Sequence, residues 1–280
     1  MYRHIARAFL ISVSIAAVGV PLVAGATTEG DVAVTLVDAS GYPDPSLDLI
    51  GTAAKTWRIE GVGDFNGNGR ADILWLNTLT REVAIWFMNG TTLVGGYKVT
   101  AAPVGTNWDV QGVGDFSGDG KDDILWLNTL TREVAIWLMN GTTISSAAIV
   151  QTVAASWGIE GVADFNDNGR ADILWRNTGT GDVAVWLMNG ITLTLGAVVQ
   201  NVPISGGWQI AGVGDFNGNG RADILWRSNS GVAVWLMDGT TLVRGYAEKL
   251  GPEAEDWDIR GAGDFDGDGH DDILWRDTGS

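Results

Sequence analysis

Five short segments of this chain place oxygen-bearing side chains at alternate positions. The first reads Asp-Phe-Asn-Gly-Asn-Gly-Arg-Ala-Asp and runs from Asp64 to Asp72. Alternate residues of a tight loop converge on one point, so positions 1, 3, 5 and 9 would offer side-chain oxygen there and position 7 its backbone carbonyl. Hard cations such as Ca²⁺ take about six to eight oxygen ligands. The segment therefore predicts a calcium-binding loop, in which glycine at position 6 permits the sharp turn.

The loop recurs at nearly constant spacing. Its copies begin at Asp64, Asp115, Asp164, Asp215 and Asp264, which are 51, 49, 51 and 49 residues apart. Five matches at one period, each closed by Asp at position 9, are far more specific than a single polar turn. We expect Ca²⁺ as the cofactor, up to five ions, one per repeat. The predicted metal ligands, in chain order, are Asp64, Asn66, Asn68, Arg70, Asp72, Asp115, Ser117, Asp119, Lys121, Asp123, Asp164, Asn166, Asn168, Arg170, Asp172, Asp215, Asn217, Asn219, Arg221, Asp223, Asp264, Asp266, Asp268, His270 and Asp272.

The loops differ from an EF-hand in sequence and from one another in charge. An EF-hand carries Glu at its twelfth position between two helices, whereas every copy here has Trp at that position and strand-forming residues on both sides. The fifth loop has four carboxylates at its ligand positions, the second has three, and the others have two each. Because ligand charge strengthens the attraction for the cation, we expect the fifth loop to bind calcium most tightly.

Each loop lies between apolar segments with the character of strands. A Trp stands seven residues before each loop, and a second apolar phrase such as Val83–Met88 follows each of the first four loops and ends in Asn-Gly or Asp-Gly, a strong hairpin signal. In the first repeat we expect strands at 57–63, 72–77 and 83–88 and a fourth beginning near Thr92. Strands buried on both faces without covering helices require sheets packed on sheets. A calcium β-roll is the alternative, but its period is about nine residues.

The predicted fold class is all-β: a β-propeller of about five four-stranded blades. The fifth repeat stops at Ser280, before its third strand. The missing strand appears at the other end of the chain, because the phrase Gly-Asp-Val-Ala-Val at residues 30–34 repeats the phrase at residues 181–185.

This repetition predicts how the ring closes. Residues 27–50 and 252–280 would share the last blade, with residues 30–37 pairing beside residues 272–277. The tryptophan count agrees with that pairing. Three per repeat over five repeats would give fifteen, the chain has 14, and the missing one falls at Thr35.

The first 26 residues (1–26) have the pattern of a secretory signal. Arg3 and Arg7 give a positive start, Ala8–Val20 is an apolar run, and Ala24–Ala26 are small residues suited to cleavage. We expect cleavage after residue 26, which leaves residues 27–280 as one domain. An uncleaved anchor is the alternative, but the run is short for a membrane span of about 20 residues. The expected location is secreted, periplasmic or cell surface, with no membrane contact after cleavage.

The composition favours cation binding and disfavours nucleic acid. The chain has 34 acidic and 17 basic residues and a net charge of −17, which repels nucleic acids and anionic lipids. The acids are concentrated, because 16 of the 34 lie in the five nine-residue loops. With no cysteine, a disulfide framework and a thiolate metal site are both excluded. We expect a monomer.

The loop phrase and the period of about 50 residues resemble the FG-GAP or VCBS repeat family, whose calcium loops also occur in the propeller of integrin α-subunits. The resemblance covers residues 30–280. It departs from the integrin pattern because no literal Phe-Gly or Gly-Ala-Pro pair stands at the expected place in each unit, and because the repeats number five rather than seven. The resemblance implies adhesion or ligand binding at the cell exterior, in some members binding of carbohydrate.

We therefore expect a binding or adhesion module whose partner is an extracellular protein or a glycan. A lectin is the alternative, because tryptophan faces stack on sugar rings and the chain has 14 of them. The set within the third strands is expected in the core, and it comprises Trp86, Trp137, Trp186 and Trp235. The candidates for a ligand groove between blades are Trp57, Trp108, Trp157, Trp208 and Trp257.

Catalysis is the least favoured class, and we expect no enzyme. Acids outside the loops repeat from unit to unit, as Glu82 and Glu133 do, so no lone carboxylate pair of the glycosidase kind stands out. After cleavage the remaining histidine would be His270, at position 7 of a loop, where its backbone rather than its imidazole would serve the metal.

Overall fold

The computed structural model describes residues 31–34, 48–100, 103–229, 231–250 and 257–278 of the 280. Over these residues the chain is all-β apart from one short 3₁₀ turn, η1, at Ile204–Gly206. Within the same residues no helix is long and apolar enough to cross a membrane. The predicted signal segment, residues 1–26, lies outside the described residues.

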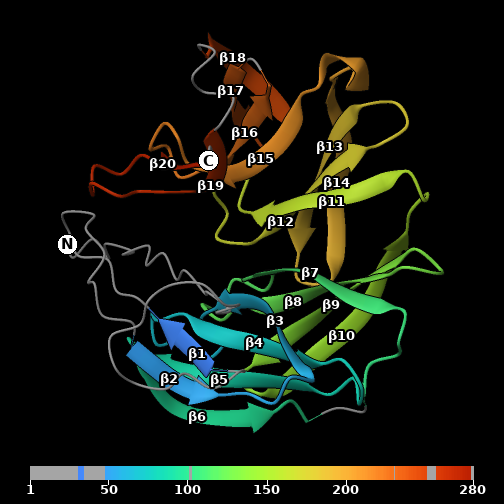
Figure 1. Ribbon diagram of the computed structural model, residues 1–280. Coiled ribbons are helices and arrows are strands. Elements are labelled where there is room, and N and C mark those ends of the chain that lie inside the picture. Colours follow the sequence, from blue (N-terminus) through green and yellow to red (C-terminus); the bar gives the residue numbers. More distant parts are fainter. Residues whose placement is uncertain (1–30, 35–47, 101–102, 230, 251–256, 279–280) are drawn as a thin grey trace.

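Four consecutive antiparallel sheets of four strands form blades 1 to 4, and each keeps the strand order of the sequence. The strands are β3 (Trp57–Gly63), β4 (Asp72–Asn77), β5 (Val83–Asn89) and β6 (Thr92–Lys98) in blade 1; β7 (Trp108–Gly114), β8 (Asp123–Asn128), β9 (Glu133–Asn140) and β10 (Thr143–Thr152) in blade 2; β11 (Trp157–Ala163), β12 (Asp172–Asn177), β13 (Asp182–Asn189) and β14 (Thr192–Asn201) in blade 3; and β15 (Gln209–Gly214), β16 (Asp223–Ser228), β17 (Gly231–Asp238) and β18 (Thr241–Lys249) in blade 4. The strands predicted for the first repeat are confirmed, with β5 continuing one residue further. Figure 1 shows the sheets following one another along an arc.

The first strands of successive blades pack closely together. β3 contacts β7, β7 contacts β11, β11 contacts β15, and β15 contacts β19 (Trp257–Gly263). Glycine permits this approach, because a Cβ on Gly61 would lie 2.9 Å from Cγ2 of Val113, closer than real Cβ contacts come. The same arrangement recurs at the pairs Gly112–Val162 and Gly161–Val213. The fourth pair differs, because Ala262 of β19 stands where the other three pairs have a valine. A Cβ on its partner, Gly212, would meet no atom within 4 Å.

The second strand of each blade sends alternate side chains to opposite neighbours. Leu74 and Leu76 of β4 pack in one cluster with Ile124 and Trp126 of β8, whereas Trp75 belongs to a separate cluster on the other face of blade 1. Strands β4, β8 and β12 are buried along their whole length. Each blade thus covers a face of the next, and the fold is a β-propeller.

A half-blade lies at each end of the arc. β19 and β20 (Asp272–Asp277) form a two-stranded sheet after blade 4, and β1 (Asp31–Val34) and β2 (Asp48–Thr52) form another. The β1–β2 hairpin has the register of an outer blade hairpin, since its pairing shifts between Val32 and Ala33 as that of β13 and β14 shifts between Val183 and Ala184. β2 contacts β6, as the outer strand β14 contacts β18. The hairpin therefore occupies the place of the outer strands of a blade that precedes blade 1.

The two half-blades are not joined in this structure. Among the described residues β1 pairs with β2, β20 pairs with β19, and no ladder connects β1 to β20. Exposure agrees, because every residue of β20 is exposed or half-buried whereas the equivalent strand β12 is buried throughout. Of the predicted pairing of residues 30–37 with residues 272–277, the described part, residues 31–34, does not pair with β20, and residues 30 and 35–37 lie outside the described residues. Ring closure stays a prediction.

Ring closure can be tested by cross-linking. In blade 3, Leu174 of β12 lies opposite Val185 of β13, and the matching residues of the half-blades are Leu274 and Val34. A closed ring brings two such Cα atoms within about 7 Å, as a disulfide requires. A Val34→Cys/Leu274→Cys chain should therefore form an intramolecular disulfide on mild oxidation, with no native thiol to compete.

The control pair is Val34→Cys with Ile273→Cys, because strand alternation turns residue 273 to the opposite face. Mass spectrometry and non-reducing gels would report the linkage. Absence of a cross-link in the first variant, or cross-links between chains only, would count against closure within one chain.

Candidate metal-binding loops

The predicted metal loops join the first strand of each blade to the second. In the first loop, Asp64 Oδ1 accepts hydrogen bonds from the backbone N–H groups of Gly67 (2.8 Å) and Asn68 (3.1 Å). Asn68 Oδ1 accepts another from the N–H of Arg70 at 2.9 Å. These bonds wind the loop around the carboxylate at position 1. In the other four loops the residue at position 5 likewise donates its N–H to Oδ1 of position 1; these residues are Asp119, Asn168, Asn219 and Asp268.

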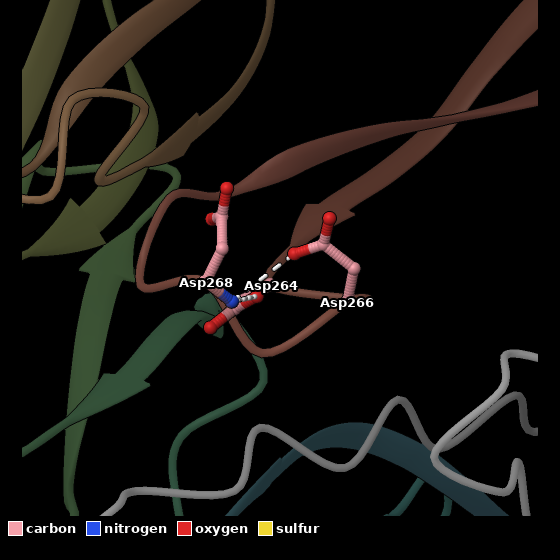
Figure 2. Close-up of side chains that lie close together, drawn as sticks. All are labelled: Asp264, Asp266 and Asp268. Carbon is pink, nitrogen blue, oxygen red and sulfur yellow. Dashed lines mark hydrogen bonds between the residues drawn. The ribbon is translucent and has the colours of Figure 1, made fainter.

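The fifth loop brings three carboxylates together. Oxygen atoms of Asp264, Asp266 and Asp268 lie within 4.8 Å of one another, and among the described residues this is the one such group of three acidic, histidine or cysteine side chains. Figure 2 shows the three side chains, with the Asp268 N–H donating to Asp264 Oδ1 and to Asp266 Oδ1, both at 3.1 Å. Like charges at this separation repel one another, and a divalent cation placed among them relieves that repulsion. Asp272, predicted as the closing ligand, is outside the group.

The third loop contains an oxygen without a partner. Oδ1 of Asn166, at position 3, is buried and accepts no hydrogen bond. Buried polar atoms are nearly always hydrogen-bonded, so an orphan acceptor at a predicted ligand position points to a missing donor or cation. In the first and fourth loops the equivalent side chains, Asn66 and Asn217, donate through Nδ2 to the carboxylate at position 9.

The carboxylate at position 9 has a structural task. Asp72 is fully buried; its Oδ1 accepts from the N–H of Met88 in β5 at 2.9 Å and its Oδ2 from the N–H of Phe65 in the loop at 3.2 Å. Asp123, Asp172 and Asp223 hold their third strands and loops in the same way. In the half-blade, Asp272 accepts from Phe265 at 3.1 Å and is exposed. In the four complete blades position 9 thus ties the loop to the third strand, a role that the ligand prediction did not anticipate.

Burial changes the acidity of these groups. It raises the pKa of Asp72 and Asp223 to about 6 and that of Asp123 and Asp172 to about 7, although the backbone hydrogen bonds act in the opposite direction. Desolvation disfavours the ionised form of a carboxyl. Each of these blades therefore holds a buried carboxylate that is costly as a bare anion at neutral pH.

Backbone hydrogen bonds join each loop to the following blade, and we call each such connection a joint. At a joint the N–H of position 8 in one loop donates to the carbonyl of position 1 in the preceding loop, as from Asp122 to Asp64 at 2.8 Å. The other joints run from Ala171 to Asp115, Ala222 to Asp164 and Asp271 to Asp215. A second bond, from the turn residue Gly141 to the Phe65 carbonyl at 2.9 Å, has counterparts in the next two blades. The loops are therefore linked in series along the arc.

These loops fit a hard cation. At positions 1, 3 and 5 the side chains offer carboxylate, amide and hydroxyl oxygens as metal ligands, and no histidine or cysteine stands at these positions. The crowded carboxylates of the fifth loop and the orphan oxygen of Asn166 both favour an ion at this place. Positions 1, 3 and 5 and the carbonyl of position 7 would hold it.

The predicted ligand tryptophans lie at the opposite end of the blades from the loops. Trp57 pairs with Asn77, whereas the loop end of the same strand pair is Gly63 with Asp72. Trp108 lines a cavity of about 350 Å³ together with Trp126, Trp137 and Ala147. The other four members differ in exposure: Trp57, Trp157 and Trp208 are half-buried and Trp257 is 40% exposed.

The tryptophans of the third strands are only half-buried. Each packs against a second-strand tryptophan, as Trp86 does against Trp75 with ring centroids 4.8 Å apart. Counterparts at 4.7–4.9 Å are Trp126–Trp137, Trp175–Trp186 and Trp226–Trp235. The most deeply buried tryptophans of the four blades are the second-strand members, at 1–3% exposure.

The fold and its loops define a class of protein, a β-propeller whose repeats each carry one oxygen-rich loop. A family model for the FG-GAP-like repeat matches residues 64–126, 115–175, 164–226 and 215–275, each match spanning two successive loops. The chain belongs to the FG-GAP-like repeat family. Among curated proteins no sequence matches it.

Several solved structures are similar to this chain at low sequence identity. A chain of the Nidogen/Laminin complex aligns with a TM-score of 0.52 and 10% identity over 83% of this chain and 78% of that one. The Dos1 propeller aligns with a TM-score of 0.48 and 11% identity over 85% and 59%. A chain of the Photorhabdus luminescens Tc holotoxin pore aligns with a TM-score of 0.40 and 12% identity over 95% of this chain but 16% of its own length. The first of these likenesses shows the fold alone.

The raised pKa values of these buried carboxyl groups predict how metal-free stability depends on pH. Folded-state pKa values of about 6 to 7 lie above the ordinary value for Asp, about 3.9, so the folded state binds more protons in between. The stabilisation that protonation supplies is present below about pH 4 and is lost as the pH rises through the folded pKa. In chelator, the melting temperature should therefore fall between about pH 5 and about pH 8.

Asp172→Asn removes one of these titrating groups, so it should flatten the curve measured by calorimetry. Saturating calcium, which favours the ionised form, should also flatten it. A melting temperature that climbs with pH in chelator would contradict the assignment.

Proposed function

We propose that this protein is an exported calcium-binding β-propeller that binds an extracellular partner. The observation that carries the proposal is the group of Asp264, Asp266 and Asp268, whose oxygens lie within 4.8 Å of one another in a loop that recurs in five repeats. An uncompensated cluster of this kind is destabilised by repulsion, and a hard cation removes it.

In this proposal calcium is structural. The loops lie at the joints between blades, so an ion that fixes a loop also fixes the surface on which the next blade rests. Five bound ions would add ten positive charges to a chain whose net charge is −17, which lessens its self-repulsion. Binding at roughly 10⁻⁴–10⁻³ M, usual for extracellular calcium modules, would suit an exported protein.

The partner-binding surface belongs to the loops and edges that a rigid ring presents. Binding residues are commonly carried on loops of rigid scaffolds, and a propeller whose loops are fixed by metal meets that condition. The proposal assigns adhesion or ligand binding and no catalysis, with an extracellular protein or a glycan as the partner and a monomer as the binding form.

Calcium dependence of the melting temperature tests the proposal. The melting temperature should rise with millimolar calcium, because an ion that binds only the folded state stabilises it by mass action. Asp268→Ala should remove more of that rise than Asn68→Ala, since it takes a carboxylate from the loop with the most ligand charge.

Differential scanning calorimetry in calcium and in chelator measures both effects. Identical curves in the two conditions would refute calcium binding. A larger loss in Asn68→Ala would leave calcium binding intact but overturn the ranking of the loops.

A lectin is the second candidate, because Trp108 of the predicted groove set lines the cavity described above. The small side chains of Ala135, Ala147 and Ala148 line this cavity together with Trp108 and Trp137. An aromatic face beside open space is suited to stacking on the apolar face of a sugar ring.

Screening against a glycan array, followed by substitution, tests this candidate. Trp108→Ala should weaken any glycan binding at least about tenfold, the effect of losing a central aromatic contact. Trp186→Ala is the matched control, since it removes a half-buried tryptophan of blade 3 that belongs neither to the predicted groove set nor to the cavity lining. Equal losses in both variants would indicate general destabilisation, and no binding to any glycan would dismiss the lectin.

A further inference from the structure

Two of the joints carry a carboxylate that the loop pattern does not require. Position 8 is Asp in the second and fifth loops and Ala in the other three. Oδ2 of Asp122 accepts a hydrogen bond from the N–H of Asp64 at 2.6 Å, and Oδ2 of Asp271 accepts one from the N–H of Asp215 at 2.8 Å. Each side chain therefore crosses from its own loop to position 1 of the preceding loop.

The residue before position 1 makes room for this crossing. A Cβ on Gly63 or Gly214 would clash with the carboxylate of Asp122 or Asp271. Before the third loop the corresponding residue is Ala163, and the residue that follows across that joint is Ala222, which has no carboxylate to accommodate. A crossing carboxylate therefore occurs only where the residue before position 1 is glycine, although Gly114 precedes the second loop without one.

The crossing carboxylates reach loops that are poor in charge. The first, third and fourth loops have the same residues at all five predicted ligand positions: Asp, Asn, Asn, Arg and Asp. Asp122 brings a third carboxylate to the first loop and Asp271 a third to the fourth, whereas the third loop receives none across its joint. The first and fourth loops are therefore identical in sequence and each receives a carboxylate from the next blade, whereas the third has the same ligand set with an acid of its own, Asp167, at position 4.

We infer that Asp122 and Asp271 are positioning residues for calcium in the preceding loops, the first and the fourth. Each holds the backbone of position 1 and adds a negative charge beside its carboxylate, so the first and fourth sites bind calcium more tightly than the same loops would without the crossing. Each also makes occupancy of its loop tighten the joint to the next blade. This inference rests on the proposed calcium binding.

Calcium titration of the purified full chain by calorimetry tests the inference. Asp122→Ala, which installs the residue native to three of the loops, should weaken one site about tenfold, the lower end of the usual cost of losing an outer-sphere partner. Asp122→Asn keeps the shape and an acceptor oxygen, so it separates charge from hydrogen bonding and serves where the alanine variant does not fold. Asp182→Ala, which removes an acid outside the loops, should leave every site unchanged.

A double-mutant cycle locates the effect. Asp122→Ala should cost nothing further when the first loop is already disabled by Asn68→Ala, and should keep its full effect when the second loop is disabled by Asp119→Ala. In the reverse direction, Ala163→Gly with Ala222→Asp should build the crossing at the third loop and strengthen one site about tenfold.

The outcomes separate the inference from the proposed function. If the parent chain takes up no calcium, both fall. If the parent binds calcium and the Asp122 variants bind it equally well, the inference falls and the function stands. A variant that lowers the melting temperature equally in calcium and chelator, with unchanged affinities, shows a purely structural clasp and also overturns the inference.

Discussion

A buried carboxylate at the ninth loop position is the interaction on which each full blade depends. Its two oxygens accept backbone N–H groups from opposite directions, one from the third strand and one from the loop, as Asp172 does from Met188 and Phe165. Without it, the loop would have no fixed attachment to the sheet and the buried amides would lack acceptors. The arrangement puts a charge where water cannot reach, and burial alone would favour its protonation. A cation bound in the adjacent loop would stabilise the ionised form of this carboxylate.

Much of the fold follows from sequence because each local signal agrees with the next. The apolar phrase Val83–Met88, the turn at Gly90 and the tryptophan at the start of β3 all fall where the structure places strands and a hairpin. Gly90 has φ of 62°, as the Asn-Gly turn requires. Repetition supplied the rest, since a pattern seen four or five times outweighs the ambiguity of one copy.

The parts that sequence did not predict depend on contacts across the chain. Position 9 looked like a ligand because its spacing fits a metal loop, and nothing local reveals that Met88 lies above Asp72 with its N–H pointing inward. Asp122 at position 8 differed visibly from the alanines of other loops, but its meaning comes from a neighbour 58 residues away. The terminal phrase at residues 30–34 predicted a strand, and it is one, yet a strand does not specify which edge it will meet.

The joints connect consecutive blades end to end, and this arrangement determines how the molecule responds to a pulling force. Each blade is hydrogen-bonded through its loop to the blade that follows, so a force applied between the two ends of the arc passes in full through every joint. In a series of this kind the weakest link yields first. The link between blade 4 and β19 lacks the valine that seats against glycine elsewhere, because Ala262 stands in its place beside Gly212. Under tension, the Asp271 crossing and the backbone bond beside it must therefore carry at this joint the load that valine packing shares at the others.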